Sequence, residues 1–359
     1  MRVAIIGCGG VGERRARALP RGSVAIVADP VLERAQKLAQ ETGARAVADA
    51  REAIADSQVQ LVIVATPNHL LAPWGLVAVR RGKHVLLEKP GARGAAELRE
   101  VVAAAQATGA RVKVGYNHRF HPAFLRIREI LEGGMQNAEC RMQNDGQTAG
   151  AVDSSADRRD PHIIHHSSFP PVGPLMFLRG RYGHGGRLGY DREWRADPAL
   201  SGGGELIDQG VHFIDLALTL LGDIERARGL CRTFFWDMPV EDNAFFLLEA
   251  ASGAVGHFHV SCTEWKNLFS LEIYTRQAKL HWEGLGRSYG PERLTCYWMR
   301  PEMGPPDVQE FEFTGEDQSW ARELEDFFAS LDDEPRCRQE AEQAVRVLEI
   351  VERIMQNDE

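Results

Sequence analysis

The 359-residue sequence predicts a doubly wound parallel α/β domain followed by an α+β domain with a mainly antiparallel, open sheet. Through residue 115, short apolar runs alternate with amphipathic helical stretches, which is typical of a parallel sheet covered by helices on both faces. From about residue 175, a helix near 205–221 is followed by strand-like runs with no helices between them, which indicates antiparallel pairing. We therefore expect a first domain at residues 1–120 and a second at residues 121–359.

The chain opens with a glycine pattern between a buried strand and a helix, in the segment MRVAIIGCGGVGERRARAL. Gly7 permits a tight strand-to-helix turn, Gly9 lets the backbone approach a pyrophosphate, and Gly12 allows the helix to pack closely on the strand. A pyrophosphate would then lie at the N-terminus of the helix. The segment predicts a Rossmann dinucleotide-binding site whose contacts come from Gly7, Gly9, Gly10, Val11 and Gly12.

Asp29 ends the second apolar run, SVAIVAD. A carboxylate at this place accepts hydrogen bonds from the two hydroxyl groups of an adenosine ribose, which favours NAD as the cofactor. NADP is the alternative, because Arg34 would offset part of the repulsion between the carboxylate and a 2′-phosphate. Asp29 also suits a simpler role as the cap of the helix that begins near Val31.

The predicted parallel strands end in three segments of unusual composition, at residues 66–69, 88–90 and 115–119. Ligands bind at the carboxyl ends of the strands in such sheets. Lys89 leaves a central strand beside the expected position of a nicotinamide ring, where a cation can polarise a substrate oxygen. The alternative is a solvated loop lysine paired with Glu88.

A polar stripe runs along the apolar helix of the second domain, in the segment SGGGELIDQGVHFIDLAL. Glu205, Asp208, His212 and Asp215 recur at intervals of three and four residues and are expected on one face, toward the other domain and a ligand rather than the core. His212 is the natural general base, because a histidine accepts a proton near neutral pH, and Asp208 would orient it or bind a substrate hydroxyl group. The alternatives are a histidine satisfied at a domain interface and a zinc pair, which lacks a third ligand.

Composition excludes several classes of partner. The formal net charge is −9, from 51 acidic and 42 basic residues, with no long basic block, so we expect no nucleic-acid or membrane partner. The six cysteines have neither CxxC nor metal-ligand spacing, which predicts reduced thiols without a disulfide. Because no signal peptide or long apolar run is evident, we expect a cytoplasmic protein.

Residues 136–172 fit neither domain and predict a flexible insertion. The segment MQNAECR is followed directly by the near-repeat MQNDGQT, and the rest is polar and rich in turn-forming residues. His162, His165 and His166 are interpreted as a solvated histidine-rich tract, because no carboxylate or cysteine completes a metal site at fixed spacing. No metal is therefore expected.

The segment YGHGGRLGYDREWR supplies candidate substrate contacts. Tyr182, His184, Trp194 and Arg195 combine aromatic, polar and cationic groups. Such groups suit a polyhydroxylated ring that carries an acidic or nucleotide-linked substituent. Trp194 is equally suited to a core position.

Taken in order, the motifs GCGGVG, ATPNH, LLEKP, GYNHRF, YGHGG with EWR, and GGGELIDQGVHFIDLAL resemble the Gfo/Idh/MocA oxidoreductases, the family of glucose-fructose oxidoreductase and inositol dehydrogenase. The resemblance covers nearly the whole chain outside the insertion. It implies that Lys89, Asp208 and His212 surround the site of hydride transfer. It also implies a set of residues that line the cofactor: Thr66, Pro67, Asn68, His69, Glu88, Lys89 and Asn117.

The motifs and the resemblance together predict an NAD-dependent dehydrogenase that transfers hydride between nicotinamide and a hydroxyl carbon of a sugar, a cyclitol or a sugar derivative, nucleotide-linked ones included. Two alternatives use the same scaffold. One is a redox-neutral NAD-dependent glycosidase, and the other is a non-catalytic dinucleotide or sugar sensor. The resemblance further implies a homodimer or homotetramer, paired through the open sheet face.

Overall fold

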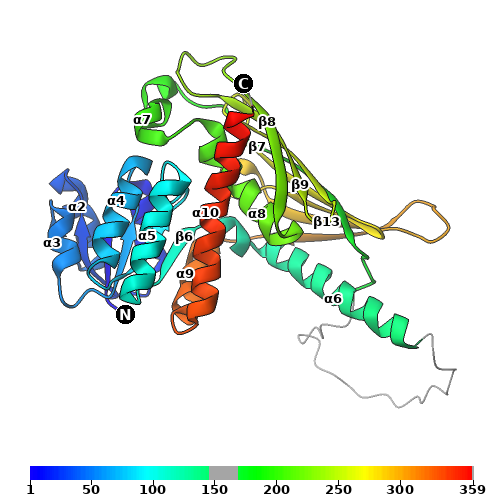
Figure 1. Cartoon of the computed structure of the whole chain (residues 1–359), viewed down its shortest axis with the longest axis horizontal. Helices are drawn as coiled ribbons and strands as arrows, with labels where there is room; N and C mark the ends of the chain where they lie inside the picture. Colours follow the sequence, from blue (N-terminus) through cyan, green and yellow to red (C-terminus); the bar gives the residue numbers. More distant parts are fainter. Residues whose placement is uncertain (145–168, 358–359) are drawn as a thin grey trace.

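The computed structural model describes residues 1–144 and 169–357; for residues 134–144 the description extends to the backbone only. An N-terminal and a C-terminal domain lie side by side, and the long helix α10 (Glu334–Gln356), red in Figure 1, runs between them. Within the described residues, no helix is both long enough and apolar enough to cross a membrane.

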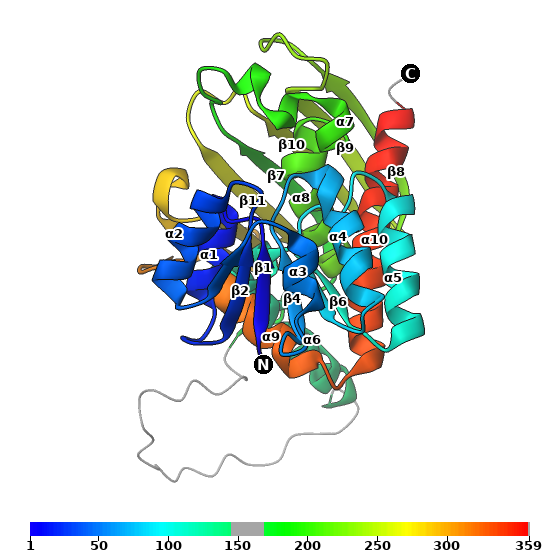
Figure 2. The same cartoon turned by 90° about the vertical axis from the view of Figure 1, so that its left-hand side faces the viewer.

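The N-terminal domain is built on a six-stranded sheet with the order β3-β2-β1-β4-β5-β6, in which all neighbouring strands are parallel. Its strands are β1 (Val3–Ile6), β2 (Val24–Ala28), β3 (Arg45–Val47), β4 (Leu61–Val64), β5 (His84–Glu88) and β6 (Val112–Gly115). The helices that cover its faces in Figure 2 are α1 (Gly10–Ala18), α2 (Leu32–Thr42), α3 (Ala50–Ala55), α4 (Asn68–Val79) and α5 (Ala95–Thr108). The predicted doubly wound sheet is confirmed.

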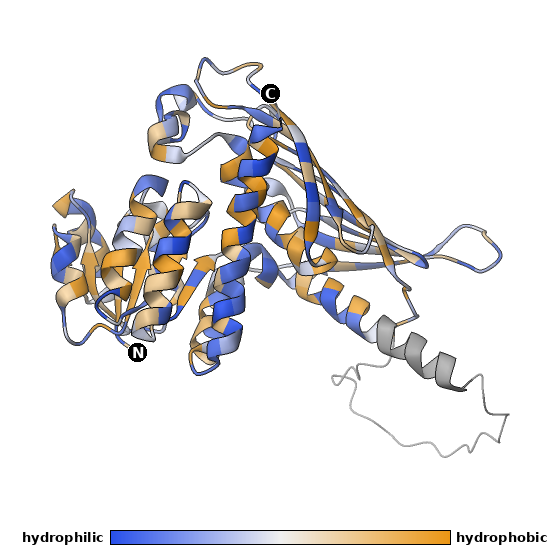
Figure 3. Ribbon diagram, viewed as in Figure 1, coloured by the Kyte–Doolittle hydropathy of each residue, from blue (hydrophilic) through white to orange (hydrophobic). Residues whose placement is uncertain are grey.

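Hydrophobic residues, orange in Figure 3, concentrate in the strands of this sheet. Strands β1 and β4 read VAII and LVIV and are buried throughout, as a parallel sheet covered on both faces requires. The edge strand β3 was not predicted, because its three residues are partly exposed and too few to form an apolar run.

The C-terminal domain is built on an eight-stranded sheet with the order β14-β13-β12-β11-β7-β10-β9-β8. Its strands are β7 (Leu175–Gly183), β8 (Ile224–Arg232), β9 (Asn243–Ala250), β10 (Val255–Ser261), β11 (Leu268–Thr275), β12 (Ala278–Glu283), β13 (Glu292–Trp298) and β14 (Asp307–Phe313). Only the β7–β10 pair is parallel among these neighbours, so the predicted, mainly antiparallel sheet is confirmed.

Strand β7 lies near the centre of the second sheet, although its sequence LMFLRGRYG does not read as an apolar run. Arg179 forms an ion pair with Glu272 of the neighbouring strand β11, so its charge is compensated within the sheet. Gly180 faces the core, where a Cβ would lie 2.7 Å from the ring of Phe213. Arg179 and Gly180 of β7 therefore contact residues that are distant in the sequence, Glu272 and Phe213.

The expected insertion at residues 136–172 requires a correction at its start. Helix α6 (Pro122–Asn144) continues through residues 136–144, which contain strong helix formers and neither glycine nor proline. At the other end, Val172 is fully buried. The rest of the repeat's second half, from Asp145 on, and His162, His165 and His166 lie outside the described residues. Within the described residues, no group of three or more His, Cys, Asp or Glu side chains is arranged to hold a metal.

The helical tail packs against the N-terminal domain as well as the C-terminal one. Helix α9 (Ser319–Ser330) contacts α1, and α10 contacts α5, β6, α8 (Val211–Leu221) and β8. Leu324, Phe327 and Cys337 belong to the same hydrophobic cluster as Val3 and Ile5 of β1. The last helices thus complete the core under the dinucleotide-binding sheet and fix the second sheet relative to it.

Candidate active site

The glycine-rich turn between β1 and α1 has the backbone geometry that a dinucleotide site needs. Gly7 has a φ of +93°, and a Cβ there would lie 2.4 Å from the carbonyl oxygen of Ala65. A Cβ on Gly12 would lie 2.0 Å from the carbonyl oxygen of Gly7. A Cβ on Gly9 or Gly10 would meet no described atom within 4 Å apart from its chain neighbours. The N-terminus of α1 is therefore open to an anionic ligand.

Asp29 lies at the end of β2 and is 6% exposed. Its Oδ2 accepts a hydrogen bond from the backbone nitrogen of Cys8 at 2.9 Å, and its Oδ1 accepts one from the backbone nitrogen of Val31 at 2.9 Å. The carboxylate therefore joins the glycine turn to the start of α2 (Leu32–Thr42). Asp29 does not cap α2, because the N-cap residue is Val31 and its side chain makes no capping hydrogen bond. Each carboxylate oxygen of Asp29 keeps a lone pair for a ribose hydroxyl group.

A cleft of about 530 Å³ lies between the two domains. It brings together the three predicted catalytic residues, three of the four predicted substrate residues, and part of the predicted cofactor set. The predicted residues that line it are Val11, Glu88, Lys89, Asn117, Tyr182, His184, Arg195, Asp208 and His212.

An ion pair between Lys89 and Asp208 bridges the domains inside this cleft. Lys89 Nζ donates hydrogen bonds to Asp208 Oδ1 and to the Asp208 carbonyl oxygen, both at 2.6 Å. Arg195 Nε lies 3.4 Å from Asp208 Oδ2. Burial alone would raise the pKa of Asp208, but the two cations outweigh it and hold that pKa below its ordinary value. Lys89 is therefore a fixed, paired cation rather than a solvated loop lysine.

His212 lies one helical turn beyond Asp208 and is 5% exposed. Burial, assisted by the positive charge of Lys89, lowers the pKa of His212 well below its ordinary value, against the opposing effect of Asp208. His212 is consequently neutral at pH 7. A neutral imidazole that faces a cleft can accept a proton from an alcohol.

The predicted polar stripe divides between three environments. The backbone over Leu206–Gly210 is a π-helical turn before α8, which shifts the helical register by one residue; such turns occur often at functional sites. Asp208 and His212 face the cleft. Asp215 is fully buried and pairs with Arg119, whose Nε donates to it at 2.7 Å. Asp208 and His212 therefore face the cleft and Asp215 faces Arg119 of the first domain, whereas Glu205 does not line the cleft.

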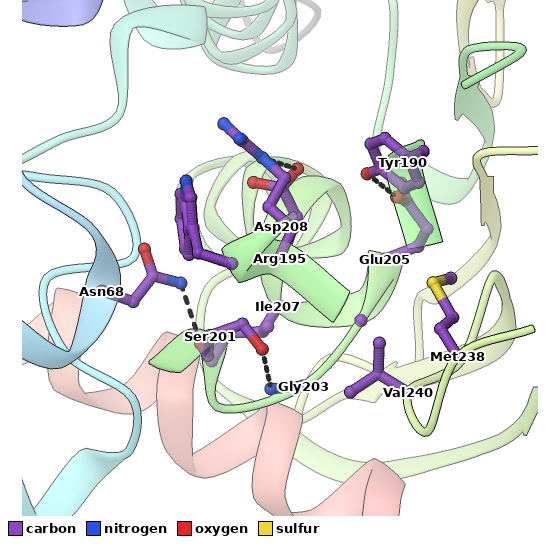
Figure 4. A pocket seen from close by; sticks show the side chains of 12 residues that line it. Asn68, Tyr190, Arg195, Ser201, Gly203, Glu205, Ile207, Asp208, Met238 and Val240 are labelled. Carbon is purple, nitrogen blue, oxygen red and sulfur yellow. Dashed lines mark hydrogen bonds and ion pairs between the residues drawn. The ribbon is translucent and has the colours of Figure 1, made fainter. Parts of the chain in front are cut away.

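The fourth member of the stripe, Glu205, lies beneath the cleft. Tyr190 donates its hydroxyl proton to Glu205 Oε1 at 2.8 Å, as Figure 4 shows. Glu205 is 1% exposed, and burial, followed by the negative charge of Asp208, raises the pKa of Glu205 to about 8. Glu205 is therefore largely protonated at neutral pH.

Asn68 and Trp194 lie beside the cleft in a smaller cavity that also contacts Asp208 (Figure 4). Asn68 Nδ2 donates a hydrogen bond to the carbonyl oxygen of Ser201 at 2.8 Å. The Trp194 ring lies under the guanidinium group of Arg195, 4.5 Å away, and lines a depression next to Gly9 and Gly10. Trp194 therefore borders the glycine turn and does not line the cleft. Thr66, Pro67 and His69 lie with Asn68 at the end of β4 and the start of α4.

Several residues that line the cleft were not predicted: Arg14, His118, His121, Arg187, Gln209, Arg287, Tyr289 and Trp320. His118 and His121 lie in or next to the segment at 115–119, whose position after a strand was the available signal. Tyr289 comes from the turn between β12 and β13, which carries no recognisable motif. Its ring lies 5.5 Å from that of Tyr182, between centroids.

The two-domain fold and the charged cleft between a dinucleotide-binding turn and an open sheet define the class of NAD-binding oxidoreductases. Residues 1–116 match the family model described as an oxidoreductase family with an NAD-binding Rossmann fold, and residues 171–281 match the GFO/IDH/MocA C-terminal domain. The chain belongs to the Gfo/Idh/MocA family, as its motifs predicted.

Among curated relatives, the chain is 31% identical to inositol 2-dehydrogenase of Renibacterium salmoninarum over 50% of this chain and 55% of that protein. It is 26% identical to levoglucosan dehydrogenase of Pseudarthrobacter phenanthrenivorans over 67% of this chain and 53% of that protein. The alignments thus span about half the length of these relatives. A solved structure of levoglucosan dehydrogenase in complex with NADH and levoglucosan shares the fold, with a TM-score of 0.77 at 20% identity over 100% of this chain and 97% of the other.

Proposed function

We propose that this protein is an NAD-dependent dehydrogenase that oxidises a secondary or anomeric hydroxyl group of a sugar, a cyclitol or a derivative of either, or reduces the corresponding carbonyl group. The observation that carries the proposal is the 2.6 Å ion pair between Lys89 and Asp208, which joins the two domains in the cleft that His212 lines. A fixed cation and a neutral base at one cleft are the groups that alcohol oxidation requires.

The glycine turn would hold the pyrophosphate of NAD, because Gly9 and Gly10 lie at the open N-terminus of α1. Asp29 would accept hydrogen bonds from the adenosine ribose, which favours NAD over NADP. When bound, the nicotinamide ring supplies the hydride acceptor. The other residues proposed to line the cofactor are Val11, Thr66, Pro67, Asn68, His69, Glu88, Lys89 and Asn117.

Each charged group in the cleft has a proposed role during oxidation. His212 accepts the proton of the substrate hydroxyl group, because its lowered pKa keeps it neutral. Lys89 donates a hydrogen bond to the same oxygen and stabilises the negative charge that develops there. Asp208 holds Lys89 in place. The remaining hydroxyl groups of the substrate meet Tyr182, His184 and Arg195 along the cleft.

The test is reduction of nicotinamide by the purified protein, with NAD and NADP supplied separately, against free sugars, inositols, sugar acids and nucleotide sugars. Steady reduction with one substrate class is the expected result. Absence of reduction across the panel, in a protein that binds NAD, would contradict the dehydrogenase. A substrate that is cleaved without net reduction would instead identify the redox-neutral glycosidase.

We further propose that the subunits pair as a homodimer or homotetramer in the cytoplasm, through the outer face of the second sheet. Leu230, Phe245 and Leu247 are exposed on neighbouring strands β8 and β9, which supports an apolar contact. Cys8, Cys262, Cys296 and Cys337 carry thiols, which a reducing compartment maintains. Sedimentation of the protein and of a Leu247→Glu variant tests the pairing, and cell fractionation tests the location.

A further inference from the structure

A glycine-rich turn between β12 and β13 forms one wall of the cleft. Gly284, Gly286 and Gly290 have φ angles of +71°, +71° and +87°, and Arg287 itself has a φ of +51°. A left-handed conformation is uncommon for a residue with a side chain and is typical of functional loops. Within this turn, Leu285, Gly286, Arg287, Ser288 and Tyr289 all line the cleft. The unusual backbone thus presents an arginine at the rim of the proposed reaction site.

Most charges that line the cleft are already paired. Lys89 and Arg195 both contact Asp208, and Arg187 lies 2.7 Å from Glu193.

The remaining acidic groups have partners as well. The Glu88 carboxylate is held by Arg15. Asp317 accepts hydrogen bonds from the backbone nitrogen of Ser319 at 2.9 Å and from its hydroxyl group at 2.6 Å, at the start of α9.

Arg14 and Arg287 are the exceptions among the cleft's cations. Both side chains are exposed, and within residues 1–144 and 169–357 neither has an acidic partner. Arg14 comes from α1 in the first domain, and Arg287 comes from the second domain. Both also line the adjoining outer depression. Two unpaired guanidinium groups that converge on one cleft from two domains are a charge surplus without an internal counter-ion.

We propose that Arg14 and Arg287 form a subsite for a single anionic substituent of the substrate, a carboxylate or a phosphate monoester, distal to Lys89 and His212. This inference rests on the proposed dehydrogenase function. Arginine suits both groups because its planar guanidinium donates two parallel hydrogen bonds to two oxygens.

The surroundings of the subsite carry charges of both signs. The outer depression beyond Arg14 and Arg287 is also lined by Arg17, Arg322 and four glutamates, Glu13, Glu292, Glu312 and Glu316. Glu13 pairs with Lys37, and Glu312 pairs with Arg293. Because Arg14 and Arg287 together can hold one anionic group, the proposed substrate class is a sugar acid or a sugar monophosphate.

The test compares a neutral hexose, the corresponding hexuronate and the hexose 6-phosphate as substrates of the wild-type, Arg287→Gln and Arg14→Gln proteins. The wild type should prefer an anionic member by on the order of tenfold or more in kcat/KM, and this ratio should fall toward one in both variants. Which anion is preferred distinguishes the carboxylate from the phosphate. Arg17→Gln is the matched control, because Arg17 is exposed on the same helix beside Glu13 and Glu41 and should leave the ratio unchanged.

The proposed subsite is contradicted if the wild type prefers the neutral hexose, or if the Arg287→Gln variant still prefers the anionic substrate. Neither result contradicts the proposed dehydrogenase activity. An Arg14→Gln variant that loses NAD affinity but keeps the preference assigns Arg14 to the cofactor and also contradicts the subsite. If no sugar is oxidised, the subsite is tested by calorimetric measurement of the binding of the hexuronate and the hexose 6-phosphate. Binding that Arg287→Gln abolishes supports the subsite, and no binding to the wild type overturns it.

Discussion

The imidazole ring of His118 lies over that of His212, with ring centroids 3.8 Å apart and ring planes inclined by 32°. His118 Nδ1 lies 3.3 Å from Asn117 Oδ1, and Asn117 Nδ2 donates to Ser319 Oγ at 2.9 Å. Because the amide nitrogen is used by Ser319, Asn117 Oδ1 acts as the acceptor and His118 carries its proton on Nδ1. Protonation of both rings would place like charges in contact, so the pair holds at most one added proton.

The pH dependence of activity should report this arrangement. Burial lowers the pKa of both His118 and His212 below the ordinary value of 6.5, and each is lowered further by Lys89. The acidic limb of kcat/KM for oxidation should therefore lie below pH 6.5, since His212 stays unprotonated until then. Initial rates measured with saturating NAD across a pH series test this. A limb centred above about pH 7 would contradict His212 as a buried neutral base.

His118 should act as a positioning residue for His212 through ring contact. In a His118→Phe variant a flat ring still supports His212, so kcat should fall only a few-fold. In a His118→Ala variant the support is lost, and a displaced base costs roughly tenfold to a hundredfold in kcat. The affinity for NAD, measured by fluorescence titration, should be the same in both variants. Equal losses of kcat in the two variants would show that His118 does not position His212 through contact between the rings.

Lys89→Met should lower turnover far more than cofactor affinity. The substitution removes the cation that stabilises charge on the substrate oxygen, and loss of one such donor costs on the order of 10²-fold to 10³-fold in kcat. The dissociation constant for NAD should change little, because the glycine turn and Asp29 remain. Lys279→Met is the matched control, because Lys279 pairs with Glu272 on the second sheet and does not line the cleft. Equal losses in turnover and NAD affinity would count against the role of Lys89.

The parallel sheet and the glycine turn could be predicted because they depend on local sequence. Strand-length apolar runs and the spacing of Gly7, Gly9 and Gly12 need no information from the rest of the chain. Lys89, Asp208 and His212 could be proposed as one site because the motifs resemble those of a known family. Their direct contact could not be predicted from spacing alone, since Lys89 and Asp208 come from different domains.

The π-helical turn before α8 could not be predicted from the polar stripe. Glu241 accepts hydrogen bonds from the backbone nitrogens of Gly204 at 2.9 Å and Leu206 at 3.0 Å. A Cβ on Gly204 would lie 1.9 Å from the carbonyl oxygen of Glu241. The conformation of this turn is thus fixed by a residue far away in the sequence. Such a long-range contact leaves no periodic signal in the helix itself.

Arg15→Met should destabilise the fold by about 3–5 kcal/mol. Arg15 is fully buried between the carboxylates of Glu88 and Glu323, with Nη1 2.6 Å from Glu323 Oε2, and its guanidinium lies 4.4 Å from the Trp320 ring centroid. Removing the cation leaves two buried carboxylates without a counter-charge. Urea denaturation measures the loss. Adding Glu323→Gln should recover part of it, and a double variant no more stable than Arg15→Met would refute this electrostatic account.

Glu205→Gln should change the pH dependence of stability. The pKa of Glu205 is raised from 4.5 to about 8 in the folded protein, chiefly by burial. Between these values the folded protein keeps a proton that the unfolded chain has lost, so stability falls as pH rises from about 5 to 8. Glutamine cannot ionise and keeps an oxygen that accepts from Tyr190.

The Glu205→Gln variant should therefore gain stability over the wild type by up to a few kcal/mol as pH rises from about 5 to 9, measured by urea denaturation across the series. Glu312→Gln is the control, because Glu312 is exposed and pairs with Arg293 on the neighbouring strand. Parallel stability curves for the wild type and Glu205→Gln would mean that Glu205 is ionised in the folded protein at neutral pH. The carboxyl group beneath the Lys89–Asp208 pair would then carry a second negative charge into the cleft.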